Sequence, residues 1–209
     1  MLCLDHLTII APSLAEGVEH VRGCLDLDIP YGGTHPEMGT HNHVLRLGEG
    51  TYLEVIAADP SVPPPAGPRW FGLGDLKVVQ SDWANGNRLR GWVARTDDID
   101  AVLIGHGELL GGKIRIGTYG QFSLLPDGSL PLDGVLPSVI DRAGRNPRST
   151  RLKDHGVQLR DFVLEHPSPA KITALYEKLG IRNAPLVQEG PRARYFATID
   201  TARGLKTLH

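Results

Sequence analysis

The chain has 209 residues, enough for one large domain or two small fused ones with a core that needs no disulfide or metal. Its 22 Lys and Arg residues nearly balance 24 Asp and Glu residues, and no basic stripe suggests nucleic-acid binding. Cys3 and Cys24 lack Cys-x-x-Cys spacing, which argues against a thiolate zinc site. With no signal-peptide pattern and no apolar run near the roughly 18 residues that span a bilayer, we expect a cytoplasmic protein without a membrane partner.

The first segment, residues 4–58, is expected to form a strand, a helix and three further strands. The strand-like run LDHLTII precedes Ser13 and Glu16, which have the spacing of a helix capping box. An apolar stripe at helical period follows and comprises Leu14, Val18, Val21 and Leu25. The runs HNHVLRL and TYLEVIAA then alternate like antiparallel strands around a Gly-Glu-Gly turn.

The same order of elements recurs twice. LRGWVARTDDIDAVLIG begins at Leu89, and LRDFVLEHPSPAKITALYEKLGI begins at Leu159; each predicts a strand followed by a helix. Further strand-like runs follow both helices. Residues 59–72 form a proline-rich connector between the first two segments. The stretch RAGRNPRSTRLKDHG separates the second from the third, and we interpret it as a solvated linker.

Two ionisable side chains interrupt apolar strands: His6 in the first strand and Glu54 in the last strand of the first segment. Burial of such a group is costly unless it has a partner. They therefore pair with each other or with a third party such as a metal. In the metal-free alternative, His6 is a core histidine hydrogen-bonded to Glu54. Glu54 would then be a general base whose proton affinity burial raises toward working pH.

The stretch THPEMGTHNH concentrates three histidines just before the strand expected to pair with the Glu54 strand. A solvated loop explains its glycine and threonines well but the histidines poorly, so we expect it to line a pocket. His35, His41 and Asn42 are candidates for substrate binding. His43 is the candidate for a third metal ligand.

The register of this hairpin decides which side chains meet Glu54. Alternation along a strand sends His41 and His43 to one face and Asn42 to the other. A register that pairs Leu47 with Thr51 places Asn42 on the face of Glu54. A slip of one residue places the histidines there instead, and the sequence leaves both registers open.

Three other residues are assigned to the site or to the core. Arg69 precedes two aromatic residues that close a core, or it lies at a rim and meets an anionic substrate. Tyr119, in GTYGQFS, is a candidate to reach the substrate. Trp92 alternates with the position that corresponds to His6, so we expect it to face away from the site and to lie in the core.

The combination of LDHLTI, HPEMGTHNHVLRLGEGTYLEVIA, RWFGL and PDGSLPLDGVLPSVID resembles the vicinal oxygen chelate superfamily, which includes glyoxalase I, bleomycin-resistance proteins and extradiol dioxygenases, and more narrowly its bacterial glyoxalase-like domain proteins. The resemblance implies an α+β fold of repeated βαβββ units with curled mixed sheets. Residues 1–145 would form a glyoxalase-like domain from two units, 4–58 and 89–142, joined through the connector 59–72. Residues 155–209 would form a third, shorter unit packed on it.

The resemblance also implies a site. In the superfamily a divalent metal is held by the first and last strands of each unit, and His6 and Glu54 stand at two such positions. Imidazole and carboxylate together suit Zn, Fe, Mn, Ni or Co. Gly91 and approximately Ser138 stand at the other two positions, so the second ligand pair is missing or rebuilt from elsewhere. Asp161 would supply a carboxylate if the third unit packs against the first.

Two functions follow from the resemblance. The first is an enzyme that acts on a small substrate with vicinal oxygens, as a lyase, isomerase or dioxygenase, through a divalent metal held by His6 and Glu54. The alternative is a metal-free protein that binds and sequesters a small molecule, as resistance proteins do. A homodimer is expected in either case, because such units often pair between chains.

Overall fold

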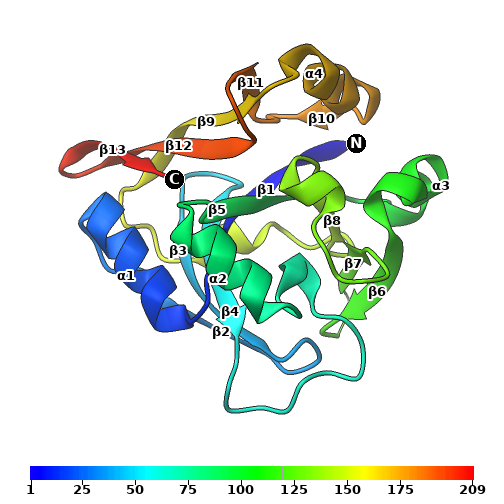
Figure 1. The fold of residues 1–209 in the computed structure, drawn as a ribbon, viewed down its shortest axis with the longest axis horizontal. Coiled ribbons are helices and arrows are strands. Elements are labelled where there is room, and N and C mark those ends of the chain that lie inside the picture. The colour runs from blue at the N-terminus through cyan, green and yellow to red at the C-terminus, as the bar shows by residue number, and fades with distance from the viewer. Residues whose placement is uncertain (119) are drawn as a thin grey trace.

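The computed structural model describes residues 1–118 and 120–209, which form two β-sheets and four α-helices (Figure 1). The helices are α1 (Leu14–Leu25), α2 (Leu76–Ala84), α3 (Ile99–Leu110) and α4 (Pro169–Lys178). Ser13 caps α1, since its side chain accepts from the Glu16 amide, as the sequence predicts. After the proline-rich connector the chain forms α2, capped by Asp75, which the sequence did not predict. Within these described residues, no helix has the length and hydropathy to cross a bilayer.

The larger sheet contains the strands of the first two units in the order β2-β3-β4-β1-β5-β8-β7-β6. Their bounds are β1 (Leu2–Ile10), β2 (Tyr31–His35), β3 (Thr40–Arg46), β4 (Tyr52–Ala58), β5 (Leu89–Thr96), β6 (Gly112–Ile116), β7 (Gly120–Leu124) and β8 (Ser138–Asp141). The first and last strands of each unit pair in parallel, β1 with β4 and β5 with β8. The two first strands pair antiparallel, so the α+β class and the curled mixed sheet are confirmed.

The strand register relates the two units by an approximate twofold symmetry. His6 lies opposite Val93, and Thr8 lies opposite Gly91. In the flanking pairs, Thr8 lies beside Glu54 and Val93 lies beside Ser138. Gly91 and Ser138 therefore occupy the positions that correspond to His6 and Glu54.

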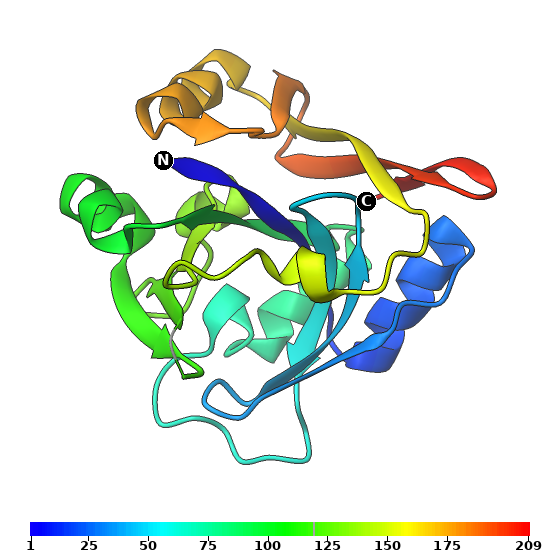
Figure 2. The same ribbon diagram turned by 180° about the vertical axis from the view of Figure 1, so that it is seen from behind.

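The third unit forms its own four-stranded sheet in the order β11-β9-β12-β13. Its strands are β9 (Gln158–His166), β11 (Leu186–Glu189), β12 (Arg194–Thr201) and β13 (Gly204–Leu208). A short strand, β10 (Ile181–Arg182), leaves this unit and pairs in parallel with β1 of the larger sheet. Both views show the smaller sheet and α4 lying along one side of the larger sheet (Figures 1 and 2).

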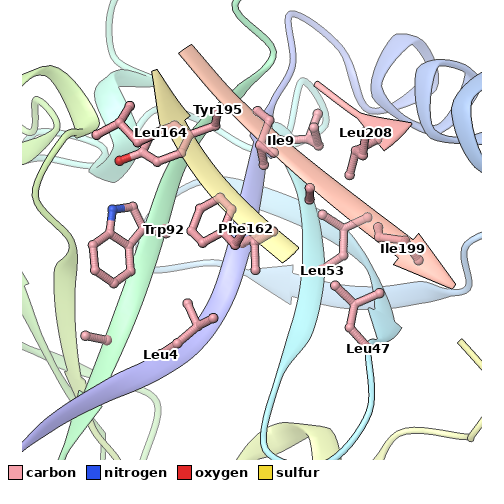
Figure 3. Packing of buried hydrophobic residues seen from close by; sticks show 14 of the residues in the cluster. Leu4, Ile9, Leu47, Leu53, Trp92, Phe162, Leu164, Tyr195, Ile199 and Leu208 are labelled. Carbon is pink, nitrogen blue, oxygen red and sulfur yellow. The ribbon is translucent and has the colours of Figure 1, made fainter. Parts of the chain in front are cut away.

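The main core lies between the two sheets, around Trp92 (Figure 3). Trp92 is fully buried and packs edge-to-face on Phe162 and Tyr176 at ring-centre distances of 6.2 and 5.6 Å. Its indole N–H and the Tyr176 hydroxyl donate to the carbonyl oxygen of Val135, and the Tyr195 hydroxyl donates to the carbonyl oxygen of Gly134 at 2.9 Å. The two tyrosines of the third unit thus bind adjacent carbonyl groups of the larger domain, which fixes the third unit on this face of the larger sheet.

A second apolar cluster lies on the opposite face of the larger sheet. It includes Ile10, Ile56, Trp70, Phe71, Val93, Phe122 and Ile140. Alternation separates the two clusters, since Trp92 belongs to the first and its neighbour Val93 to the second. One face of the sheet is therefore covered by the third unit, and the other carries the pocket described below.

Replacing Trp92 with Ala is expected to lower the free energy of unfolding by about 3–5 kcal/mol, because it empties the centre of the inter-sheet core and leaves two tyrosine hydroxyls around Val135 without packing. Urea unfolding followed by circular dichroism measures the loss. Ile104→Ala serves as the control, because Ile104 is 90% exposed on α3 and its loss should change stability by less than about 0.5 kcal/mol. Equal effects of the two substitutions would contradict this account of the core.

Candidate functional site

A β-bulge in β1 places two consecutive ionisable residues on the pocket face. Leu4 pairs with Ala94 and His6 pairs with Val93, so Asp5 is the extra residue between them. Leu4 lies in the inter-sheet core, whereas both Asp5 and His6 are turned away from it. Bulges re-aim side chains in this way and are frequent beside active sites.

The His6 imidazole lies between two carboxylates. Its Nδ1 is 2.8 Å from Oδ1 of Asp5, and its Nε2 is 3.3 Å from Oε2 of Glu54. The ring stacks on Tyr52, with ring centres 4.5 Å apart. All three ionisable residues are nearly inaccessible to solvent. Because an ionised carboxylate only accepts hydrogen bonds, Asp5 fixes the proton on Nδ1 and directs Nε2 toward Glu54.

Arg142 completes this line of charges. Its Nη2 lies 2.6 Å from Oδ1 of Asp5 and 3.3 Å from the hydroxyl of Tyr52. Asp5 thus has cationic partners on both sides. The residues Arg142, Asp5, His6 and Glu54 are hereafter the charge line.

Asn42 holds Glu54 from the neighbouring strand. Val44 lies opposite Glu54, and the Leu47 amide donates to the Thr51 carbonyl oxygen, so the hairpin has the register that places Asn42 on the Glu54 face. The Nδ2 of Asn42 donates to Oε1 of Glu54 and to Nε2 of His35. Burial lowers the pKa of His35, in agreement with a neutral ring that accepts at Nε2.

The charge line shifts the pKa values of its members. Burial alone would lower the pKa of His6, but its hydrogen bonds to Asp5 and Glu54 and their negative charges outweigh burial and raise it. Burial alone would raise the pKa of Glu54, but the contacts with His6 and Asn42 lower it to about 2. The pKa of Asp5 is about 2 for the corresponding reason, with Arg142 adding to the effect. The expectation that the pKa of Glu54 lies above its usual value is therefore wrong, because the partners of Glu54 outweigh its burial.

A cavity of about 420 Å³ opens above the charge line, within the range typical of small-molecule sites. Its polar floor contains His6, His35, Tyr52 and Glu54. Its apolar wall contains Trp70, Phe71, Ile116, Phe122 and Ile140. Arg142, Arg145, Arg148 and Arg151 line one side. The stretch that we interpreted as a solvated linker thus forms part of the pocket, and that interpretation is corrected.

The structure does not bring His41 and His43 to the charge line. They lie opposite Ala57 and Val55 in the hairpin, on the face away from Glu54. The Nδ1 of His43 donates to the carbonyl oxygen of Ile29 at 2.6 Å, and neither histidine lines the pocket. The register excludes His43 as a third ligand and His41 as a substrate contact at this cavity.

The remaining candidates have varied positions. Arg69 precedes the pocket residue Trp70, but its own side chain lies near Gly39 and does not line the cavity. Asp161 lies on β9, in the smaller sheet, and lines a different cavity. Tyr119 lies outside the described residues. Trp92 faces the core, as expected.

Sequence reasoning missed several members of this site. Asp5 was visible only as a charge beside His6, and strict alternation would have sent it to the other face. Tyr52 is two residues before Glu54, so its shared face follows from alternation once Glu54 is chosen. The arginines of the linker recur every third residue, a regularity that was noted only as charge.

The charge line fits two positions of a metal's coordination shell. Two ligands each about 2.1 Å from one ion lie about 3.0–3.4 Å apart, and the Nε2–Oε2 distance of His6 and Glu54 is 3.3 Å. A carboxylate behind a ligating histidine, here Asp5, is the usual second partner. Among the described residues, however, no three His, Cys, Asp or Glu side chains form a group that could hold an ion. With Gly91 and Ser138 in the second pair's positions, the described residues supply two ligands where catalytic zinc usually has three.

The family model described as "Glyoxalase-like domain" matches residues 4–180 of this chain, so the match extends past residue 145 into the third unit. No curated protein matches the chain. A hypothetical protein from Staphylococcus aureus has a similar structure, with a TM-score of 0.64 and 12% identity over 98% of this chain and 93% of that chain. A variant of Streptomyces coelicolor methylmalonyl-CoA epimerase in complex with 2-nitronate-propionyl-CoA covers 70% of this chain and 99% of its own, with 21% identity and a TM-score of 0.47. The likeness to the Staphylococcus aureus protein shows a shared fold alone.

Replacing Glu54 with Gln should lower the pKa of His6, because it removes a charge that stabilises the imidazolium. A nuclear magnetic resonance titration of the His6 ring measures the shift directly. Glu19→Gln, which changes an exposed carboxylate on α1 outside the pocket, is the control variant and should leave the His6 titration unchanged. An unchanged His6 titration in the Glu54→Gln protein would contradict the placement of Glu54 beside Nε2.

The charge line should also shape the pH dependence of stability. The lowered pKa values of Asp5 and Glu54 stabilise the fold above their unfolded values of about 4, and this contribution is lost as the pH falls toward about 2. The raised pKa of His6 acts in the opposite direction: its contribution is complete below about pH 6.5 and is lost as the pH rises through the raised value. Urea unfolding between pH 2 and 9 measures the loss of stability at acidic and at alkaline pH. Glu54→Gln should make both losses smaller. An identical profile for the variant would argue against the coupling.

Proposed function

The chain belongs to the glyoxalase-like domain family, within the vicinal oxygen chelate superfamily, and from this premise we propose that it is an enzyme that acts on a small, oxygen-bearing substrate at His6 and Glu54. The observation that carries the proposal is the buried pair of these two side chains at the floor of the cavity, with Nε2 and Oε2 3.3 Å apart. A buried, perturbed ionisable pair in a cleft is a typical feature of functional sites.

His6 Nε2 and Glu54 are the residues that would hold a divalent ion, of which Zn, Fe, Mn, Ni and Co suit these ligand types. The ion would supply Lewis-acid stabilisation of charge on a substrate oxygen. Substrate oxygens or water would complete a shell to which the described residues contribute two ligands. The arrangement is compatible with the lyase, isomerase and dioxygenase reactions of the superfamily.

The chain's own residues prepare His6 for proton transfer. Asp5, held by Arg142, keeps a proton on Nδ1 and so leaves Nε2 as the reactive nitrogen. Glu54, with its pKa of about 2, remains ionised at working pH and stabilises a second proton on Nε2. His6 is therefore the proton carrier of the pair, whereas Glu54 orients it and stabilises its positive charge. A carboxylate of such low basicity is by itself a weak general base.

The Nε2 proton and a divalent ion would compete for the same nitrogen. Metal binding at this site should therefore become tighter as the pH rises and should release a proton. The apolar wall formed by Trp70, Phe71 and Phe122 would exclude water from one side of the reacting group.

A second candidate function is metal-free binding or sequestration of a small molecule. Gly91 and Ser138 in the positions of the second ligand pair favour it, as does the apolar wall. A thermal-shift panel separates the two, because a ligand stabilises the fold by an amount that grows with the logarithm of its concentration over its dissociation constant. Stabilisation by apolar compounds alone, with none by divalent ions, would support this alternative. The homodimer and the cytoplasmic location stay predictions from the sequence.

We expect Ni²⁺ or Zn²⁺ to bind the purified protein with a stoichiometry of about one, measured by isothermal titration calorimetry in two buffers of different ionisation enthalpy to detect the released proton. His6→Gln and Glu54→Gln should each weaken binding by about tenfold or more, and the double substitution should abolish it. His155→Ala, which removes an exposed histidine away from the pocket, is the matched control. Absence of binding, or binding indifferent to the first two substitutions, would remove the metal from this proposal.

A further inference from the structure

Four arginines on one short segment line the same cavity. Arg142, Arg145, Arg148 and Arg151 recur at every third residue of the segment that follows β8. Hydrogen bonds within the segment keep it in place: the Ala143 amide donates to the Asp141 side chain, and Arg148–Arg151 form a 3-10 turn. The cationic side of the pocket is therefore built on a folded segment.

Arg148 is held in place by contacts with two other segments of the chain. It is half-buried, its Nη2 donates to the carbonyl oxygen of Gly32 at 3.1 Å, and its guanidinium carbon lies 5.9 Å from the centre of the Tyr52 ring. Tyr52 also stacks on His6. The guanidinium is thus held beside the floor of the cavity and retains further N–H groups to donate to a ligand.

The charges around the cavity do not cancel. Asp5 is matched by Arg142, and Glu54 is matched by His6, so the charge line is neutral when His6 is protonated. The other carboxylate that lines the pocket is Glu37, which accepts from the Gly117 amide at 3.1 Å. Among the described residues that line the cavity, Arg148 and Arg151 therefore outnumber Glu37. A positive excess of this kind attracts and holds an anion.

We propose that the ligand of this pocket is an acidic small molecule, with an apolar body and one oxyanion group of the carboxylate or phosphate type. The oxyanion binds Arg148, with Arg145 and Arg151 adding charge, because a planar guanidinium matches such a group with two parallel hydrogen bonds. The apolar body packs on the wall formed by Trp70 and Phe122. This inference rests on the proposed function only in assigning the reacting oxygen to His6 and Glu54.

The test uses three probes of similar size on the full, metal-free chain: benzoate, phenyl phosphate and the neutral benzamide. Isothermal titration calorimetry at fixed ionic strength should detect binding of at least one anion, at least tenfold tighter than benzamide. Whichever anion binds more tightly identifies the oxyanion type. Arg148→Gln should weaken binding of that anion by about tenfold or more, the loss expected for a hydrogen bond to a charged group. Arg151→Gln, which removes only a nearby charge, should weaken it measurably but by a smaller factor.

Arg160→Gln is the matched control, because this arginine is exposed on β9, pairs with Asp200 and lies outside the cavity. Arg151→Gln guards against misfolding of the Arg148 variant, since Arg151 is exposed and its loss opens no buried space. Equal binding of benzamide and the anions, binding of none of them, or unchanged affinity in both pocket variants would overturn the inference. Metal binding by His6 and Glu54 is measured separately, so either result can fail without the other.

Discussion

The structure depends on one buried line of alternating charges, from Arg142 through Asp5 and His6 to Glu54. Each member is expensive to bury alone, and the cost is offset only because every charge has an opposite neighbour within hydrogen-bonding or ion-pair distance. The line joins β1, β4 and the segment after β8, which are distant in sequence. The same contacts therefore form the floor of the pocket and attach the start of the arginine segment to it. Removing a single partner leaves its neighbour buried and uncompensated, a loss of about 3–5 kcal/mol in comparable pairs.

The sheet holds the residues of the charge line in fixed positions. Its far face is covered by the third unit, whose Tyr176 and Tyr195 donate to the carbonyl oxygens of Val135 and Gly134, and Trp92 packs in the core between the sheets. The strands that carry His6 and Glu54 are thus central and buried on both faces. Sites built on rigid strands hold their geometry better than sites on loops. In our proposal, the choice of ligand falls to the arginine segment that follows β8.

The features that depend on strand order and on side-chain alternation could be predicted from the sequence. The resemblance to the superfamily implied that the first and last strands of a unit lie side by side, so the contact between His6 and Glu54 could be predicted. One of the two hairpin registers left open placed Asn42 against Glu54, as the structure has it. The bulge at Asp5 breaks alternation and depends on pairing with β5, a tertiary property. The low pKa of Glu54 was missed because the burial of one group was weighed without its partners. The arginine segment has no periodic apolar pattern, so only its tertiary contacts reveal that it lines the pocket.

The two halves of the sheet share an approximate symmetry but differ in the chemistry of their side chains. A side chain at Gly91 would meet Leu130, whose Cδ2 lies 3.2 Å from the place of an added Cβ, and the methyl of Ile10 at 3.7 Å. A histidine there could not simply restore the second ligand pair, because apolar side chains already occupy that space. The second half therefore provides the apolar wall through Phe122 and Ile140, and the first half provides the ionisable floor. An ion at this floor would be held from one side only, so its retention would depend on the oxygens of the bound substrate, and metal and ligand affinity would be coupled.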